Sequence, residues 1–260
     1  MPNLVKEYSV FEADKYKNLM PQLRNAGLRP LNTADIMREK LEALNTKNLQ
    51  LVAFWLDRYF DTVDGIAYNN GERKIVLDAK PLLEIQSNSN LNEGALILQP
   101  KYDYGKLEGE KFSLRQLQKA GIDRRLSEDE AINHPVWLAL ARGDKHLLRE
   151  YRDAIFAEIK IRYSDKQGMG VYLSSEQKHP SMRAWAVSAL SNRSGAYDRH
   201  GLGGNARLVG VRSKITEGDA QKLVRAYAPE DIEIIRRTIE TLKSTTKPEI
   251  LKPLEEMVRR

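Results

Sequence analysis

A hairpin signal in residues 62–85, TVDGIAYNNGERKIVLDAKPLLEI, constrains the fold more than any other part of the sequence. Two short apolar runs flank Asn70-Gly71, a dipeptide typical of the tight turn between antiparallel strands. Asp64 and Asp78 lie at the outer ends of the two runs, and Lys80 follows the second acid by two positions. The pattern predicts a pair of strands with charged groups at their open end.

The length of the turn decides which side chains share a face of the sheet. A shift of one residue in the pairing of the two strands moves every side chain of one strand to the other face. A two-residue turn would point the two acids to opposite faces. A three-residue loop at 70–72 would oppose Asp64 to Asp78 and apolar residues to apolar residues, so hydrophobic matching favours this register. Lys80 then shares the face of Asp78. Two facing carboxylates repel, so this register predicts a bound divalent cation, and Mg²⁺ prefers such oxygen ligands.

On these residues the stretch resembles the restriction-endonuclease-like nucleases, whose signature is PD…(D/E)xK. The resemblance implies that Asp64 is the first acid and that Asp78-Ala79-Lys80 is the (D/E)xK element. It also implies a Mg²⁺-dependent DNA endonuclease, in which Asp64 and Asp78 bind the metal and Lys80 assists the attacking water. Val63 stands where the family has proline. The alternative is a surface hairpin with solvated, charged ends.

A second stretch resembles part of the pyrimidine-dimer DNA glycosylases, which implies a metal-independent glycosylase or lyase as an alternative function. Removal of Met1 would leave Pro2 with the kind of terminal amine that such enzymes use as a nucleophile. The competing interpretation is a pair of amphipathic helices that bury their apolar side chains. The residues that carry the resemblance are Asn133-His134-Pro135, Gly143, Tyr151, Ala154-Ile155 and Glu158.

The charge of the chain favours a polyanionic partner. The net charge is +6 and the pI is about 9.3, which makes nucleic acid, with DNA favoured, a plausible ligand. Residues 181–215 contain six basic side chains and a single acid, Asp198, and the segment around 191–207 is rich in glycine. The backbone of a glycine-rich segment can approach phosphates closely, and arginine side chains can bind them; the other interpretation is a plain surface loop. The residues predicted to contact nucleic acid are Arg183, Arg193, Arg199, His200, Arg207, Arg212 and Lys214.

Two further functions stay open at this point: a nucleic-acid-binding protein without enzymatic activity, and an enzyme of small-molecule metabolism. An endonuclease that cuts both strands of a duplex would often be a two-fold homodimer. The chain lacks cysteine and long apolar stretches, and its first residues have no apolar signal-peptide core, so we expect a cytoplasmic protein without a membrane span.

The remaining patterns predict an α+β fold, rich in helices, with a small mixed or antiparallel sheet built on the hairpin at 62–80. Helix signals include a cap at Asn32 or Thr33, a helix end at Gly121 and a capping box from Ser127 to Glu130. The segment PSMRAWAVSAL is also predicted to be helical. We expect a hairpin-bearing catalytic part at 1–125 and a helical part with the basic loop at 126–260, or one continuous domain.

Overall fold

The computed structural model describes residues 8–46, 48–164, 168–175, 179–191 and 193–212. The chain divides into two compact units, Met1–Arg212 and Ser213–Arg260, and every described residue belongs to the first. The helices are α1 (Tyr16–Asn25), α2 (Thr33–Leu44), α3 (Leu49–Leu56), α4 (Lys80–Leu83), η1 (Pro100–Tyr102), η2 (Tyr104–Lys106), α5 (Leu114–Ala120), α6 (Glu128–Asn133), α7 (Pro135–Leu140) and α8 (Lys145–Tyr163). The strands are β1 (Tyr8–Lys15), β2 (Arg29–Pro30), β3 (Phe60–Asn69), β4 (Glu72–Val76), β5 (Leu91–Asn92), β6 (Ala95–Ile97), β7 (Glu110–Ser113), β8 (Arg125–Leu126), β9 (Met169–Tyr172), β10 (Ser181–Val187), β11 (Ser194–Tyr197) and β12 (Asn205–Val211).

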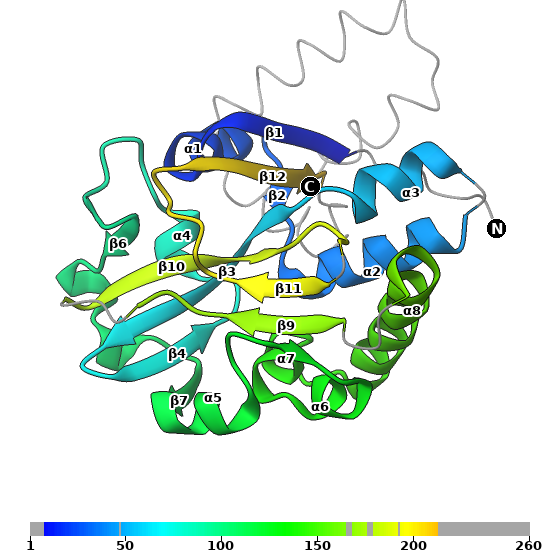
Figure 1. The fold of residues 1–260 in the computed structure, drawn as a ribbon. Helices are drawn as coiled ribbons and strands as arrows, with labels where there is room; N and C mark the ends of the chain where they lie inside the picture. The colour runs from blue at the N-terminus through cyan, green and yellow to red at the C-terminus, as the bar shows by residue number, and fades with distance from the viewer. Residues whose placement is uncertain (1–7, 47, 165–167, 176–178, 192, 213–260) are drawn as a thin grey trace, which may run out of the picture. The chain divides into compact units, whose positions relative to one another are not determined.

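Two sheets organise these elements (Figure 1). The larger sheet has nine strands; its main path runs β7-β4-β3-β10-β11-β9-β8, while β6 pairs with β10 and β5 with β6. The smaller sheet has three strands in the order β1-β12-β2. β9 and β11 pair in parallel, and β3 pairs with its neighbours β4 and β10 in antiparallel fashion. Strands that precede and strands that follow residue 125, where the two predicted parts of the chain meet, therefore belong to the same sheet.

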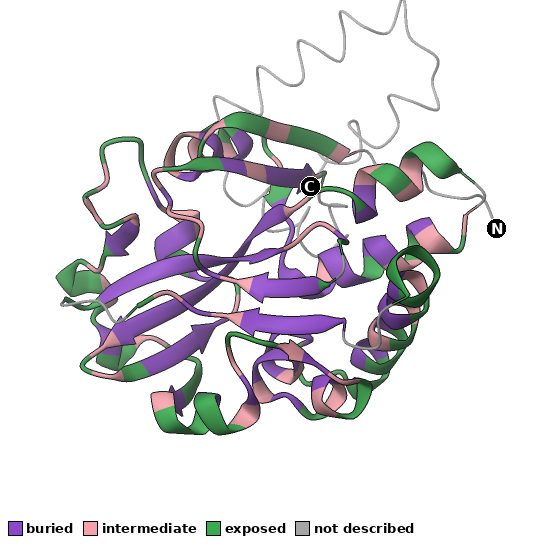
Figure 2. Cartoon of the chain, in the orientation of Figure 1, coloured by how far each residue is buried: buried purple, intermediate pink, exposed green. Residues whose placement is uncertain are grey.

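The central strands β3 and β10 are buried on both faces (Figure 2). Alternate side chains of β3 enter different core clusters: Ile66 and Tyr68 pack with residues of α2, α7 and α8, whereas Val63 and Ala67 pack with residues of α1 and α4. β10 divides in the same way, with Trp185 in the first cluster and Met182 in the second. Helices thus cover both faces of the sheet, as is required when its middle strands are buried on both faces.

The predicted helix-rich fold with a small sheet is wrong, because the nine-stranded sheet dominates the described part of the chain. The clearest error is residues 181–187, which form the central strand β10 instead of a helix. A strand that is buried on both faces has no alternation of polar and apolar residues, and such a run cannot be distinguished from a buried helix by periodicity. In addition, residues 8–15 form a strand, β1, which pairs with β12 in the smaller sheet.

The predicted register of the hairpin is also wrong. β3 and β4 are joined by a two-residue turn, with Asn69 opposite Glu72 and Ala67 opposite Lys74. Asn70 and Gly71 both have positive φ, 45° and 80°, as in the turn whose twist matches that of the strands it joins. Hydrophobic matching failed because Lys74 is buried, and its ammonium group donates to the carbonyl oxygens of Tyr104 and Leu107 at 2.7 and 2.6 Å.

Several local helix signals are confirmed. Asn32 caps α2 in a capping box with Asp35, Ser127 and Glu130 form a second box, and Gly121 ends α5 with a φ of 102°.

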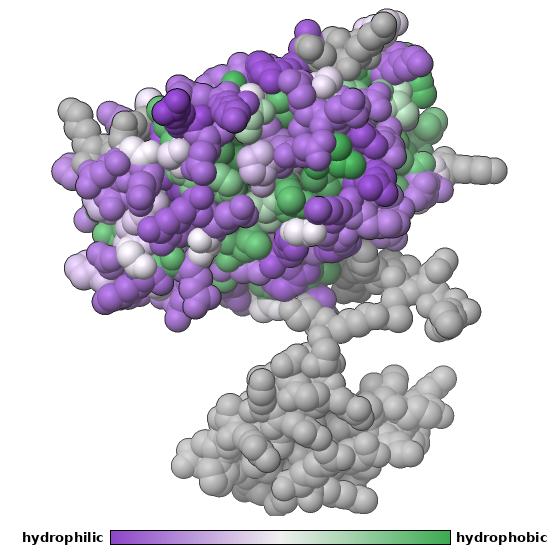
Figure 3. Space-filling view, turned by 90° about the horizontal axis from the view of Figure 1, so that it is seen from below, coloured by the Kyte–Doolittle hydropathy of each residue, from purple (hydrophilic) through white to green (hydrophobic). Residues whose placement is uncertain are grey.

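Seen from below, the side of the molecule that carries α5, α6 and α7 is mainly hydrophilic, with apolar residues scattered between polar ones (Figure 3). None of the helices in the described ranges combines the length and apolar character that a bilayer-spanning segment requires.

Candidate functional site

Two glycines on neighbouring strands make room for the ring of Tyr172. Strands β9 and β11 lie side by side (Figure 1). In this parallel pair Gly170 lies opposite Gly195, and Tyr172 lies opposite Tyr197. Side chains alternate along each strand, so these four residues share one face of the sheet. A Cβ atom on Gly170 would lie 2.7 Å from the Tyr172 side chain, and one on Gly195 would lie 3.2 Å from it. The half-buried ring therefore lies over backbone that only glycine leaves free.

Replacing Gly170 with alanine is expected to lower the free energy of unfolding by about 1–3 kcal/mol, the usual cost of overpacking. The new methyl group would meet the Tyr172 side chain and, at 2.9 Å, the backbone oxygen of Arg124. In the matched variant Gly195→Ala the nearest atoms to the methyl group belong to the side chains of Tyr172 and Ser188, at 3.2 and 3.6 Å, so it should cost less. Urea denaturation measures both; a Gly170→Ala variant as stable as the original chain would contradict the expectation.

Two arginines hold the Tyr172 ring from the loops on either side of β11. The guanidinium of Arg193 lies 4.7 Å from the ring centroid, and that of Arg199 lies 5.9 Å from it. Arg199 is positioned by hydrogen bonds from Nε to the Leu173 oxygen at 2.8 Å and from Nη2 to Asp123 at 2.6 Å. A cation over an aromatic face contributes about 0.5–1 kcal/mol at exposed sites. The tyrosine is therefore presented in one orientation.

A second aromatic group continues this face. The imidazole of His200 meets the rings of Tyr59 and Tyr197 edge-on, with centroids 4.7 and 4.9 Å apart. The guanidinium of Arg207 lies 5.0 Å from the Tyr59 centroid and forms an ion pair with Glu12. We call the whole set the tyrosine–arginine surface; it consists of Tyr59, Tyr172, Arg193, Tyr197, Arg199, His200 and Arg207.

A buried polar network supports the tyrosine–arginine surface from beneath. Asp198, between Tyr197 and Arg199, is fully buried and accepts hydrogen bonds from the Tyr68 hydroxyl and, at 2.6 Å, from the backbone N–H of Ser174. Burial raises the pKa of Asp198, and these hydrogen bonds oppose the rise. Because the network joins β3 to the ends of β9 and β11, the strand ends that carry the tyrosines are held in fixed relation.

The glycine-rich loop after Asp198 is packed against the β5–β6 turn. The backbone N–H of Leu202 donates to the Gly94 oxygen at 2.8 Å, and a Cβ atom on Gly94 would lie 2.7 Å from the Cα of Gly201. Gly94 also has a φ of 78°, a backbone conformation that residues other than glycine rarely adopt. The glycines of this loop thus serve a close approach of two backbone segments.

The basic residues that were predicted to contact nucleic acid lie in different environments in the structure. Arg183 is buried, and its guanidinium donates to the carbonyl oxygens of Glu93 and Asp198. Arg212 is exposed at the end of the last described range, and Lys214 lies outside the described residues. The remaining four belong to the tyrosine–arginine surface: Arg193, Arg199, His200 and Arg207.

Sequence reasoning missed the three tyrosines. Tyr59 follows α3, Tyr172 ends β9 and Tyr197 ends β11, so their positions along the chain are far apart. Nothing in their spacing indicates that they meet; only the pairing of β9 with β11 and the packing of His200 on Tyr59 bring them together.

The predicted metal-binding pair is brought together, but with a guanidinium beside it. Asp64 is fully buried and accepts backbone hydrogen bonds from Thr33 at 2.8 Å and Asp78 at 3.0 Å. Arg142 Nη2 lies 2.6 Å from Asp78 Oδ2 and 3.7 Å from Asp64 Oδ1. Burial raises the pKa of Asp64, although the hydrogen bonds and Arg142 oppose this. The arrangement ties β3 to α2 and to the turn after β4.

Lys80 does not join these acids. Its side chain is 76% exposed, and its ammonium lies 3.8 Å from Glu84. Among the described residues no group of three or more His, Cys, Asp or Glu side chains could hold a metal ion.

The residues that resemble the DNA glycosylases are mostly structural. His134 caps α7 by accepting from the backbone N–H of Val136 at 3.3 Å, and burial lowers its pKa to about 4. The Tyr151 hydroxyl lies 2.9 Å from Ser194 Oγ in the core, and Glu158 forms an ion pair with Arg162 on the next turn of α8. Pro2 lies outside the described residues.

Comparison with known proteins identifies the fold. No family model matches the chain, and no curated protein matches it. It is similar to a solved structure reported as "Accommodation of massive sequence variation in Nanoarchaeota by the C-type lectin fold", with a TM-score of 0.62 and 18% sequence identity. The match covers 80% of this chain and 98% of the other. At this identity the similarity defines the fold and nothing further.

The C-type lectin fold overturns the nuclease interpretation. The resemblance of residues 62–80 to the restriction-endonuclease-like family is wrong, and with it the predictions of a Mg²⁺-dependent DNA endonuclease and of a DNA glycosylase. A signature of about twenty residues depends on the geometry of the strands that carry it. Here those strands, β3 and β4, belong to the nine-stranded sheet and pair in a different register from the predicted one.

Proposed function

We propose that this chain is a binding protein that recognises another protein through the tyrosine–arginine surface. The observation that carries the proposal is the set of three tyrosine rings held by arginines and a histidine at one end of the large sheet. Tyrosine and arginine are enriched at the energetically important positions of protein interfaces. A rigid tyrosine supplies a large contact area at a low cost in conformational entropy.

Charge distribution indicates which part of a partner would meet Arg193. Arg199 and Arg207 form ion pairs with Asp123 and Glu12, respectively. Arg193 makes no ion pair with any described carboxylate and is exposed, although it contacts the Tyr172 hydroxyl at 3.4 Å. A partner that places a carboxylate at this point would supply the missing counter-charge.

The fold supports the same proposal. The Nanoarchaeota protein is reported to accommodate massive sequence variation on the C-type lectin fold. A scaffold with this property holds a changeable surface on a constant core. In this chain the buried network at Asp198 and the packed loop at Gly201 provide such a core directly beneath the tyrosine–arginine surface.

Tyr172→Ala and Arg193→Ala are each expected to weaken partner binding about tenfold or more, as hot-spot truncations cost at least about 1–2 kcal/mol. Arg115→Ala, an exposed arginine on α5, is the matched control and should leave binding unchanged. Partners are captured by cross-linking in extracts of the source cells with the original chain and each variant. Purified candidates are then titrated by calorimetry.

A partner whose affinity falls with Tyr172→Ala and Arg193→Ala, but not with Arg115→Ala, supports the proposal. The proposal fails if the original chain captures no protein that binds it after purification. It also fails if the affinity of every such protein is insensitive to both surface variants. Circular dichroism melting checks that each variant is folded.

A further inference from the structure

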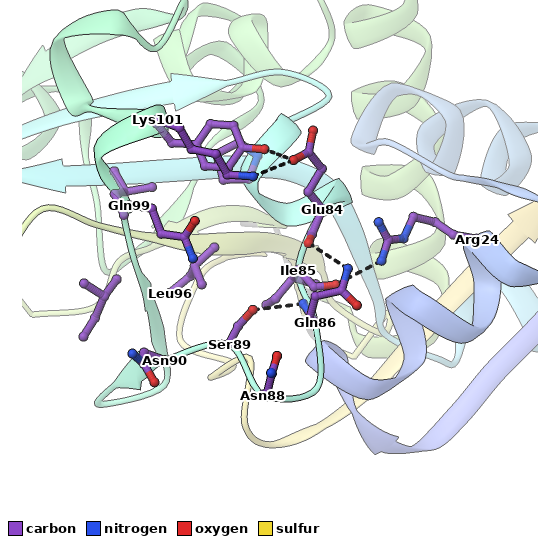
Figure 4. A pocket seen from close by; sticks show the side chains of 14 residues that line it. Arg24, Glu84, Ile85, Gln86, Asn88, Ser89, Asn90, Leu96, Gln99 and Lys101 are labelled. Atoms are coloured by element: carbon purple, nitrogen blue, oxygen red, sulfur yellow. Dashed lines mark hydrogen bonds and ion pairs between the residues drawn. The ribbon is translucent and has the colours of Figure 1, made fainter.

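A polar cavity lies apart from the tyrosine–arginine surface, between α1, α4, β6 and η1 (Figure 4). Its volume is about 550 Å³, within the range typical of ligand-binding sites. In Figure 4, Arg24 reaches the cavity from α1 on the right, Glu84 and Lys101 meet at its upper edge, and Asn88 and Asn90 lie at its lower edge.

The negative charge of the cavity is already matched within the chain. Lys101 Nζ lies 3.0 Å from Glu84 Oε2, and the Tyr102 hydroxyl donates to the same carboxylate. Lys80 Nζ lies 3.8 Å from the other carboxylate oxygen, Oε1. The hydrogen bonds from Tyr102 and Lys101 lower the pKa of Glu84 and keep it ionised at neutral pH. Because two ammonium groups already engage this carboxylate, it does not neutralise the remaining cation of the cavity.

Arg24 is that remaining cation, and most of its hydrogen-bonding capacity is unused. Its Nη2 donates to the Ile85 oxygen at 3.2 Å, which holds the guanidinium at the cavity wall. Among the described residues Nη1 has no acceptor and no carboxylate forms an ion pair with Arg24, while Nε is buried without a partner. A guanidinium offers five N–H donors in a planar array that matches a carboxylate. The cavity therefore presents a preformed positive group without a counter-charge.

Carboxamides and apolar side chains complete the lining. Asn88, Asn90 and Gln99 are exposed, and their side chains make no hydrogen bond within the described ranges. Each carboxamide both donates and accepts, so it can pair with a peptide group, which offers one donor and one acceptor. Ile85 and Leu96 line the same cavity. An inorganic anion would satisfy the guanidinium alone, and a neutral ligand would leave it without a counter-charge.

We propose that this cavity binds an N-acylated α-amino carboxylate, the group found at the C-terminal end of a peptide chain. The carboxylate pairs with the guanidinium of Arg24 through charge-assisted hydrogen bonds. The adjacent peptide group meets the carboxamides, and the terminal side chain lies against Ile85 and Leu96. A free acylated amino acid and the end of a protein chain both carry this group, and the length of the ligand distinguishes them.

Calorimetric titration of the full chain with acetylated tripeptides that end in leucine, valine or phenylalanine tests the proposal. Each tripeptide is used with a free C-terminal carboxylate and as its C-terminal amide. We expect at least one free acid to bind about tenfold to a hundredfold more tightly than its amide, because amidation removes the charge that faces Arg24. This comparison uses the original chain, so it does not depend on the folding of any variant. N-acetylleucine is the single-residue arm: affinity equal to that of the tripeptide indicates a free acylated amino acid, and weaker binding indicates the end of a peptide chain.

Variants of the protein locate the binding. Arg24→Gln should weaken the binding of the free acid about tenfold to a hundredfold and remove the preference for the acid over the amide. Gln99→Ala should weaken both forms about twofold to tenfold, since each loses a neutral hydrogen bond. Arg115→Gln, an exposed arginine on α5, is the matched control and should change neither. Circular dichroism melting checks that each variant is folded.

The proposal fails if neither the tripeptide acids nor N-acetylleucine bind, if the amides bind as tightly as the acids, or if folded Arg24→Gln keeps the preference for the acid. Stronger binding of inorganic phosphate than of every acid in the set would also reject it. The cavity shares no residue with the tyrosine–arginine surface. Tyr172→Ala should therefore leave the binding of these ligands unchanged, and a loss in that variant would place them outside the cavity.

Discussion

Replacing Asp64 with alanine is expected to lower the free energy of unfolding by about 3–5 kcal/mol, because a buried carboxylate that accepts two backbone hydrogen bonds is removed. The change leaves the backbone N–H groups of Thr33 and Asp78 without their acceptor. Each unsatisfied buried group costs about 1–3 kcal/mol. It also removes a carboxylate that lies 3.7 Å from the guanidinium of Arg142. Urea denaturation measures the loss.

The matched variant is Asp78→Asn. The Asp78 side chain is half exposed, and its ion pair with Arg142 is expected to contribute less than about 1 kcal/mol. Asparagine tolerates the positive φ of 45° at this position, so the backbone is not strained by the change. The two aspartates should therefore differ sharply in their effect on stability. Equal losses in the two variants would show that Asp64 is not the structural anchor inferred from its burial.

Local signals in the sequence were sufficient to predict several elements. The capping box at Ser127, the cap at Asn32 and the glycine that ends α5 depend on side chains within three or four residues of the backbone groups they satisfy. The position of the hairpin followed from Asn70-Gly71 for the same reason. The partners in these short-range interactions are close together along the chain, so the sequence alone is enough to predict them.

The register of the hairpin and the identity of β10 depend on distant parts of the chain. Lys74 can lie opposite Ala67 because η2 and the residue after it supply two carbonyl oxygens for its buried ammonium. β10 is a strand because β3, β6 and β11 pair with it. Without those neighbours its apolar run is equally compatible with a buried helix.

The candidate site was predicted only in part, for a related reason. The basic composition of residues 181–215 directed attention to this segment, and Arg193, Arg199, His200 and Arg207 lie on the tyrosine–arginine surface. Composition could not show that Arg183 is buried, because burial follows from its place on the central strand. The tyrosines that complete the site come from segments that only the folded sheet brings together.

Beneath the site, a buried lysine couples stability to pH. Lys40 in α2 is completely buried, and its ammonium donates to the Ser188 carbonyl oxygen at 2.8 Å. The hydroxyl oxygen of Ser188 accepts a hydrogen bond from the backbone N–H of Gly195 at 2.6 Å. Ser188 therefore ties α2 to the turn from which Arg193 extends. Burial lowers the pKa of Lys40 from 10.5 to about 7, and the charge of Asp57 opposes this only in part.

We expect the stability contributed at Lys40 to rise with pH between about 7 and 10.5. In this interval the unfolded chain holds a proton on Lys40 that the folded chain has released, so the unfolded state binds more protons and the free energy of unfolding increases with pH. Below pH 7 both states are protonated, and the cost of the buried charge is constant. Since one pKa unit corresponds to about 1.4 kcal/mol, the total gain is about 3–5 kcal/mol.

Lys40→Met isolates this effect, because methionine fills a similar volume without a titrating group. The stability of the original chain relative to Lys40→Met, measured by urea denaturation at pH 6, 8 and 10, should increase steadily from pH 6 to pH 10. Near pH 6 the variant should equal or exceed the original chain, since it removes a buried charge at the cost of one hydrogen bond to Ser188. Lys119→Met, an exposed position on α5, should show no such trend. A difference that stays constant from pH 6 to pH 10 would mean that Lys40 keeps its proton in the folded chain, and burial would then not be the dominant influence on its ammonium group.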